Sequence, residues 1–153
     1  MRDVEIAKHF VKATVVILST MAGITATPGK PYVKKDQAAK GDISAIIGVT
    51  GPKNGTISVS FSTQSATGLV TGMLGDAVED LNQDMQDAVG EVANMISGQA
   101  RAGIAEAGLV LNGSTPSVVV GKNHIIHHIS KAVVMAIPFT TLDGEFTVEF
   151  CLA

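Results

Sequence analysis

Two acidic residues and an asparagine are regularly spaced in the middle of the chain. Glu91 follows Asp87 by four residues, and Asn94 follows Glu91 by three. On an α-helix these three side chains lie on one face. Carboxylates attract cationic groups, and a carboxamide donates and accepts hydrogen bonds without adding charge. The row therefore predicts a polar helix face on which a basic partner could dock.

The surrounding sequence extends this row along a long helix. At 100° per residue the polar positions fall within an arc of about 80°, and they comprise Asp80, Asp84, Asp87, Glu91, Asn94 and Gly98. The apolar positions gather on the opposite side and are expected to face the core; they are Leu81, Met85, Ala88, Val89, Val92 and Ile96.

The acidic face has two interpretations. Like charges four residues apart destabilise a helix by about 0.2–0.5 kcal/mol per pair, and no Lys or Arg occurs from Gly75 to Ala100. Acidic residues near a helix start also suit the helix dipole and solubility. That explanation accounts for Glu79 and Asp80 better than for Glu91 in mid-helix. Helix geometry alone leaves docking and solubility open.

The elements that must position this helix follow from periodicity and turn residues. Helices are expected over residues 2 to about 20, Gln64 to Leu74 and Glu79 to about Ala107, with a loop from Gly23 to Lys40. Strands are expected over Asp42 to Thr50, Thr56 to Thr63, Ser117 to Val120, Ile125 to Phe139 and Glu145 to Leu152. The order α-β-β-α-α-β-β-β predicts one α+β domain over residues 1–153, with an antiparallel sheet and long helices packed on one face.

The first helix is expected to be amphipathic. Its apolar residues at helical spacing are Val4, Ala7, Val11, Val15, Leu18 and Ala22. The stretch VVILSTMAGITA also resembles a signal-peptide core, but Asp3 and Glu5 dilute the positive charge before it. No apolar run reaches the about 18 residues of a spanning helix. We therefore expect a cytoplasmic protein that does not enter the membrane.

Other groups with possible chemistry are less convincing. On one strand His124 and His128 would lie about 13 Å apart, with His127 on the other face, so one metal ion cannot join them. We interpret them as polar positions on a half-exposed strand and predict no metal site. The glycines of GLVTGMLGD lack the Gly-Lys-Ser/Thr of a phosphate-binding loop. Cys151 is expected to be a buried or interface thiol.

Composition limits the class of protein. Hydrophobic residues make up 46% of the 153 residues and charged residues 16%, which is typical of a globular chain. The net charge of −3 argues against a nucleic-acid partner, because binding phosphates needs clustered Lys and Arg. The single cysteine cannot form an intrachain disulfide.

Four sequence features resemble the CheC/CheX/FliY family of chemotaxis phosphatases. GEVANMISGQA is similar to the family's E-x-x-N helix, with Asp87 four residues before Glu91 and Pro116 after twenty-one intervening residues beyond Asn94, one fewer than the family pattern. IIGVTGPKNGTISVSFS resembles the hairpin of CheX-type members, and STPSVVVGKN resembles their strand and turn after the active helix. The element order agrees as well. The first helix, VEIAKHFVKATVVIL, lacks the second E-x-x-N of two-site members, which implies one catalytic centre.

The resemblance implies a reaction and roles for its residues. It implies hydrolysis of the aspartyl phosphate of a CheY-like response regulator, with Asn94 positioning the attacking water. Glu91 would pair with the regulator's active-site Lys. Asp84, Asp87, Gly98 and Pro116 would contribute to docking. Mg²⁺ would be supplied by the regulator, so no cofactor of the chain's own is expected.

Two further expectations accompany this interpretation. CheX-type proteins form dimers by joining sheets across subunits, and the C-terminal strand Phe146 to Leu152 is expected to be the edge that pairs. The alternative function is a non-catalytic CheX-like module that binds a receiver or a flagellar switch component. The presence of both Glu91 and Asn94 disfavours this alternative, because a pure binder does not need a water-positioning amide.

Overall fold

The computed structural model describes residues 1–75, 83–128 and 131–153. Its helices are α1 (Asp3–Ala22), α2 (Thr63–Leu74) and α3 (Gln83–Glu106). These bounds confirm the predicted first two helices to within two residues, and Gly75 ends α2 in the left-handed conformation at φ 80°. The long helix is confirmed from Gln83 onward. Glu79, Asp80 and Leu81, which the sequence placed in it, lie outside the described residues.

Eight strands form one antiparallel sheet in the described part of the chain. They are β1 (Thr27–Pro28), β2 (Tyr32–Lys34), β3 (Ala38–Thr50), β4 (Gly55–Phe61), β5 (Asn112–Gly113), β6 (Ser117–His127), β7 (Val134–Thr141) and β8 (Gly144–Leu152). The strand order is β1-β7-β8-β4-β3-β5, with β2 also pairing with β7 and β6 with β3. The predicted α+β fold with an antiparallel sheet is confirmed.

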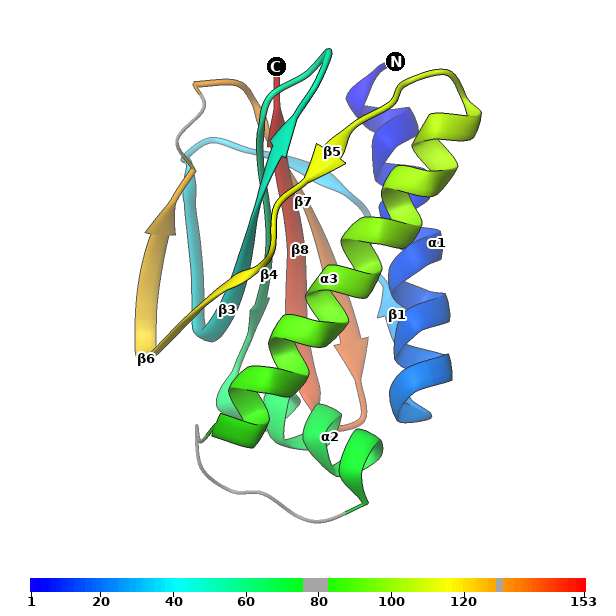
Figure 1. Cartoon of the computed structure of the whole chain (residues 1–153). Helices are drawn as coiled ribbons and strands as arrows, with labels where there is room; N and C mark the ends of the chain where they lie inside the picture. Colours follow the sequence, from blue (N-terminus) through cyan, green and yellow to red (C-terminus); the bar gives the residue numbers. More distant parts are fainter. Residues whose placement is uncertain (76–82, 129–130) are drawn as a thin grey trace.

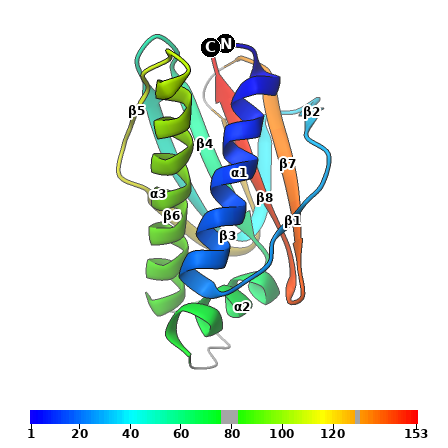
Figure 2. The same ribbon diagram turned by 90° about the vertical axis from the view of Figure 1, so that its right-hand side faces the viewer.

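The three helices lie on one face of this sheet (Figures 1 and 2). α1 and α3 run side by side across it, and α2 lies at one end. Apolar side chains from both layers meet in a continuous core. The ring of Phe10 on α1 stacks on Phe150 of β8, with centroids 5.2 Å apart. This core places the outward face of α3 in solvent.

The C-terminal strand is not an edge, so the predicted dimer strand was wrong. β8 pairs with β4 along one side and with β7 along the other. Its apolar residues alternate into the core, as Phe146, Val148 and Phe150 do. A strand that ends a chain can still be central, because its place in the sheet is set by which neighbours pair with it and not by its position in the sequence.

A predicted loop and a predicted strand also differ from the structure. The segment from Gly23 to Lys40 contains β1, β2 and the start of β3. The predicted strand from Ile125 to Phe139 is instead the end of β6 and most of β7. β6 stops at His127 because that residue pairs with Ala38, where β3 begins.

The buried side of α1 is rotated from the predicted one. Ile6, Phe10 and Ile17 are buried, although none of them was in the predicted apolar set. Ala7, Leu18 and Ala22 are buried as expected. Val4, by contrast, is 55% exposed, and Val11 is only partly buried. α1 therefore keeps an apolar strip outside the core.

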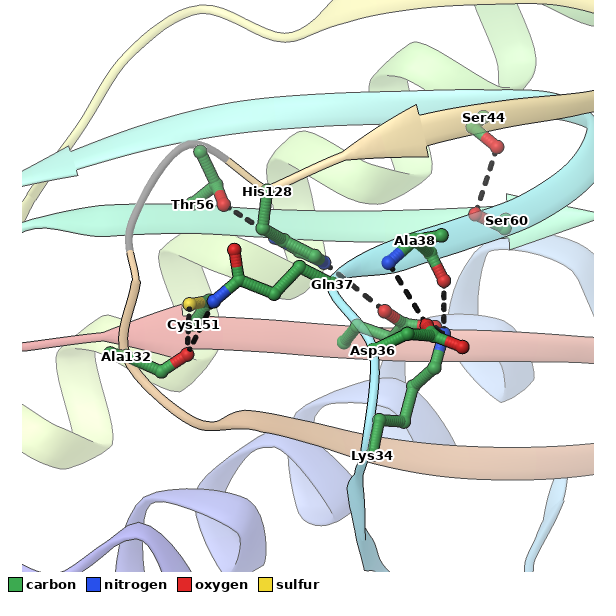
Figure 3. A network of polar contacts seen from close by, with 11 residues as sticks. Lys34, Asp36, Gln37, Ala38, Ser44, Thr56, Ser60, His128, Ala132 and Cys151 are labelled. Atoms are coloured by element: carbon green, nitrogen blue, oxygen red, sulfur yellow. Dashed lines mark hydrogen bonds and ion pairs between the residues drawn. The ribbon is translucent and has the colours of Figure 1, made fainter.

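Polar side chains occupy the face of the sheet that the helices leave open (Figure 3). Glu149 of β8 accepts a hydrogen bond from Lys34 Nζ at 3.1 Å and lies 3.1 Å from His128 Nε2. The other ring nitrogen, His128 Nδ1, lies 2.5 Å from Thr56 Oγ1. Glu149 is 3% exposed and His128 5%. His128 is thus buried, and its interpretation as a position on a half-exposed strand was wrong.

Candidate active site

The outward face of α3 presents the predicted polar row. Asp84, Asp87, Glu91 and Asn94 are exposed, while Met85, Val89, Val92 and Ile96 on the opposite side are fully buried. The sequence forms a helix here because its apolar residues recur at a period that matches the helical turn. For the described part of α3, the predicted division into a polar face and a core face is confirmed.

Part of this polar row lines a shallow depression of about 310 Å³, together with a segment that is distant in the sequence. Asp87, Glu91 and Asn94 line it from α3, and Pro116 lines it from the connection between β5 and β6. The structure therefore brings together four of the six predicted site residues. Asp84 and Gly98 do not line the depression. They lie on α3 on either side of it, Asp84 three residues before Asp87 and Gly98 four residues after Asn94.

The segment that holds Pro116 is anchored on the sheet. Ser114 donates its backbone N–H to the carbonyl oxygen of Gly48 on β3 at 2.8 Å. The N–H of Gly48 donates in return to Ser114 Oγ, also at 2.8 Å. These two bonds fix the chain just before Pro116, so one wall of the depression is held by β3 and the other by α3.

A close approach between α3 and β6 sets the width of the depression. A Cβ atom added to Gly90 would lie 3.2 Å from Cγ2 of Val118, which is tighter than ordinary van der Waals contact. Gly90 and Val118 both line the depression. The missing side chain at Gly90 therefore lets the helix lie directly against the start of β6.

The polar groups in the depression are open to a partner. The side chains of Glu91 and Asn94 make no hydrogen bond with any residue that the structure describes. Asp87 Oδ1 accepts one bond, from Gln83 Nε2 at 2.8 Å. An amide with free donors and an acceptor can hold a water molecule, and a free carboxylate can pair with a cation.

The lining residues limit the chemistry of the site. They include neither Ser, Cys, His nor Lys in the described part of the chain. Of the side chains that can form a covalent acyl or phosphoryl intermediate, the described lining therefore offers only carboxylates and the hydroxyl of Thr115. What it offers is an exposed amide and two carboxylates held in fixed positions, which suits positioning and docking.

Sequence reasoning missed some residues of the depression. Gln86, Gly90, Thr115 and Val118 also line it. Helical spacing contained a signal for Gly90, which follows Gln86 by four residues and precedes Asn94 by four. Thr115 was detectable only as the neighbour of Pro116. Val118 had no sequence signal of its own, because its role depends on the packing of β6 against α3.

The candidates rejected from the sequence lie elsewhere. His124 Nε2 is 2.7 Å from Ser44 Oγ, and His127 is exposed. Within residues 1–75, 83–128 and 131–153 no three His, Cys, Asp or Glu side chains are grouped to hold a metal ion. Cys151 is buried, as predicted, and its Sγ donates to the carbonyl oxygen of Ala132 at 3.2 Å. Among the described residues no helix is both long and apolar enough to cross a membrane.

Comparison with known proteins supports the resemblance. The family model described as chemotaxis phosphatase CheX matches residues 43–140, a stretch that includes the whole depression. A solved structure of a chemotaxis protein from Desulfovibrio vulgaris Hildenborough is 64% identical, with a TM-score of 0.92 over 97% of both chains. The CheY-P phosphatase CheX of Thermotoga maritima is 25% identical over 94% of this chain and 92% of its own length.

A more distant structure contains a second protein. It is the CheX–CheY–BeF3–Mg²⁺ complex from Borrelia burgdorferi, whose matching chain is 21% identical with a TM-score of 0.76. The match covers 95% of this chain and 96% of that one. At this identity the likeness concerns the fold.

Proposed function

The chain belongs to the chemotaxis phosphatase CheX family, and on this premise we propose that it hydrolyses the aspartyl phosphate of a CheY-like response regulator. The observation that supports this most directly is the depression on α3. It combines the Asn94 amide with the Glu91 carboxylate, one turn apart on an exposed helix face, and neither group is hydrogen-bonded to a described residue. The relative from Thermotoga maritima is a CheY-P phosphatase, and the Borrelia burgdorferi complex pairs CheX with CheY.

Asn94 is the proposed catalytic residue. Hydrolysis of an aspartyl phosphate needs a water molecule in line with the bond that breaks. The Asn94 carboxamide accepts a hydrogen bond from that water through its oxygen and donates through its nitrogen to an oxygen of the phosphoryl group. Because the amide is neutral, it does not repel the phosphoryl group as a carboxylate would. Holding the water in this position lowers the entropic cost of the attack.

Glu91 is the proposed anchor for the partner. Its carboxylate would pair with the active-site Lys of the response regulator and so fix how far Asn94 reaches into that protein. Asp87 and Asp84 extend the negative face toward the start of α3, and Pro116 supplies a rigid wall opposite. The partner would supply Mg²⁺ with its phosphoryl group, so the chain needs no metal ligands of its own.

We also expect a homodimer, although not through β8. β6 is an eleven-residue strand that pairs with β3, and no described strand pairs with its other side. Its exposed apolar residues include Val120 and Ile125. A long edge of this kind can pair with a second copy. Light scattering after gel filtration would give the mass, and a monomer at all concentrations would contradict this expectation.

The test of the function is the decay of radiolabelled receiver phosphate. Wild-type protein should accelerate the decay, and Asn94→Ala should lower the accelerated rate about 100-fold, as loss of one positioned group does in other enzymes. Gln99→Ala removes an exposed amide from the same helix outside the depression and serves as the control. Binding to a receiver loaded with beryllofluoride and Mg²⁺ should be unchanged in Asn94→Ala.

Two outcomes would contradict the proposal. If wild-type protein binds receivers from its own organism but accelerates none of them, the chain is the non-catalytic interaction module. If Asn94→Ala retains full activity, the phosphatase reaction does not depend on water held by this amide.

A further inference from the structure

A second hollow lies on the other side of α1 from α3 and has a different character. It has a volume of about 520 Å³ and runs between α1 and residues 28–31. Its apolar lining includes Val4, Val11, Pro31 and Met135, and its cationic lining consists of Lys8, Lys12 and Lys30. We call it the lysine groove. Figure 2 shows β1 and β2 on one side of α1 and α3 on the other.

Part of the apolar surface of the lysine groove is a strip of α1 that the core covers only partly. The core takes Ile6, Phe10 and Ile17, so Val4 projects beside it and Val11 is only partly buried against it. Val4 is 55% exposed. Outside the lining, Tyr32 and Val33 of β2 are 50% and 58% exposed. Exposed apolar side chains that gather beside a groove can mark an interaction site.

The wall opposite α1 is fixed in place. Pro28 pairs with Phe139 in the sheet, and Gly29 donates its N–H to the carbonyl oxygen of Pro138 at 2.7 Å. A ligand would therefore meet a groove that needs no rearrangement to receive it. Pro28 and Pro31 have no N–H to donate, which disfavours the addition of a β-strand along this wall. An occupant must be recognised through its side chains, as a helix lying in a groove is.

The charges around the groove define the occupant further. Lys8 and Lys12 lie four residues apart on α1, and Lys30 lies on the opposite wall. None of the three lysines forms an ion pair with a residue that the structure describes. Like charges at this spacing destabilise a helix slightly. Cations on both walls of an apolar groove match a ligand that is apolar along its inner face and acidic along both edges.

We propose that the lysine groove binds an amphipathic, acidic helix of a partner protein. The apolar face of that helix packs on Val4, Val11 and Met135, and its flanking carboxylates pair with the lysines on both walls. A fatty acid would place one carboxylate at one end and leave the lysines of the other wall unpaired. The α3 face is acidic and the groove is basic, so the two surfaces select different partners. Their positions on opposite sides of α1 allow both to be occupied together.

The test uses a synthetic helical peptide and the full chain. The peptide is about 18 residues long, because shorter isolated helices are marginal in water. It has leucines at helical spacing on one face and glutamates on both edges, and a control peptide has lysines in place of the glutamates. Fluorescence anisotropy measures binding, and amide chemical shifts locate it on the protein.

The expected result is binding of the acidic peptide alone, with shifts confined to α1 and residues 28–33. The double variant Lys8→Gln/Lys12→Gln should weaken binding about tenfold, a change of about 1.4 kcal/mol. Val4→Asp should weaken it as well, and its exposed position keeps folding intact. Lys122→Gln, at an exposed lysine outside the groove, should leave binding unchanged.

Several results would overturn the proposal. Equal binding of both peptides, no effect of the lysine substitutions, or shifts on α3 would each do so. Binding of decanoate in the groove without peptide binding would show a lipid site instead. A dimer that Val4→Asp dissociates would show that a second copy fills the groove. None of these measurements involves receiver phosphate, so the proposal can fail or succeed independently of the phosphatase reaction.

Discussion

Gly90 of α3 and Val118 of β6 approach so closely that a Cβ atom at Gly90 would lie 3.2 Å from Cγ2 of Val118. This contact joins the helix to the strand that follows Pro116. Asn94, one turn further along α3, therefore faces a wall made by a segment that lies over twenty residues away in the sequence. The width of the depression, and so the space that it offers to a partner, depends on this helix–strand contact.

Gly98→Ala should change the stability of the fold and the affinity for the receiver in opposite directions. A Cβ atom there would meet only Nη2 of Arg101, at 4.0 Å, so alanine has room. Replacing a mid-helix glycine by alanine should raise the free energy of unfolding by about 1 kcal/mol in a urea titration. If the partner's backbone approaches Gly98, binding of the beryllofluoride-loaded receiver should nevertheless weaken about tenfold. Unchanged binding would mean that Gly98 only relieves crowding within this chain.

Glu91→Gln should weaken receiver binding through loss of charge. The substitution keeps the shape of the side chain and removes the proposed ion pair, and we expect about a tenfold increase in Kd. The dependence of Kd on salt concentration should also become shallower, because one fewer charge pair is screened. Glu106→Gln, at an exposed acid near the end of α3, is the matched control. An equal effect of both substitutions would indicate general electrostatic attraction and not a specific pair.

The contributions of Glu149 and Lys34 to the free energy of unfolding should be coupled. Both side chains are mostly buried and lie 3.1 Å apart. Glu149→Gln leaves the Lys34 ammonium without its buried carboxylate and should lower the free energy of unfolding by about 3 kcal/mol. Adding Lys34→Met removes that charge, which among the described residues would keep only the exposed Asp36 at 3.5 Å as an ionic partner, and should recover at least about 1 kcal/mol. Glu145→Gln, exposed on the same strand, should have little effect. Additive losses in the double variant would contradict the coupling.

Asp42 should make stability depend on acid pH. The backbone N–H groups of Asn123 and Thr63 donate to its carboxylate at 2.9 and 2.8 Å, and they lower the pKa of Asp42 below its ordinary value of 3.8. The ionised carboxylate thus stabilises the folded state. This contribution is present above the unfolded pKa and disappears as the pH falls through the lower folded pKa.

Asp42→Asn should therefore make the free energy of unfolding depend less steeply on pH in the acid range. The variant should lose about 1–2 kcal/mol at neutral pH, where the charged acceptor contributes. Its free energy of unfolding should then fall less steeply than that of the wild type below about pH 4. Urea titrations at a series of pH values measure both slopes, and parallel curves would contradict the role of the Asp42 carboxylate.

The long helix was predictable because its signal is local. Met85, Val89, Val92 and Ile96 recur at a spacing that assigns a core face within one segment, and the exposed position of Asn94 follows from the same count. The hairpin of β3 and β4 was predictable for a similar reason, since its turn residues lie between two apolar strands. The strand from Ile125 was not, because its end depends on where β3 begins.

The sequence by itself therefore determined the main helices, the β3–β4 hairpin and the acidic face of α3, because helical and strand periodicity act between near neighbours. Only the tertiary structure placed Pro116 beside Asn94, put β8 in the middle of the sheet and buried His128 against Glu149. These relationships depend on which distant segments pair and pack. Periodicity predicts which face of a segment is buried. Which other segment packs against that face depends on the tertiary structure of the whole chain.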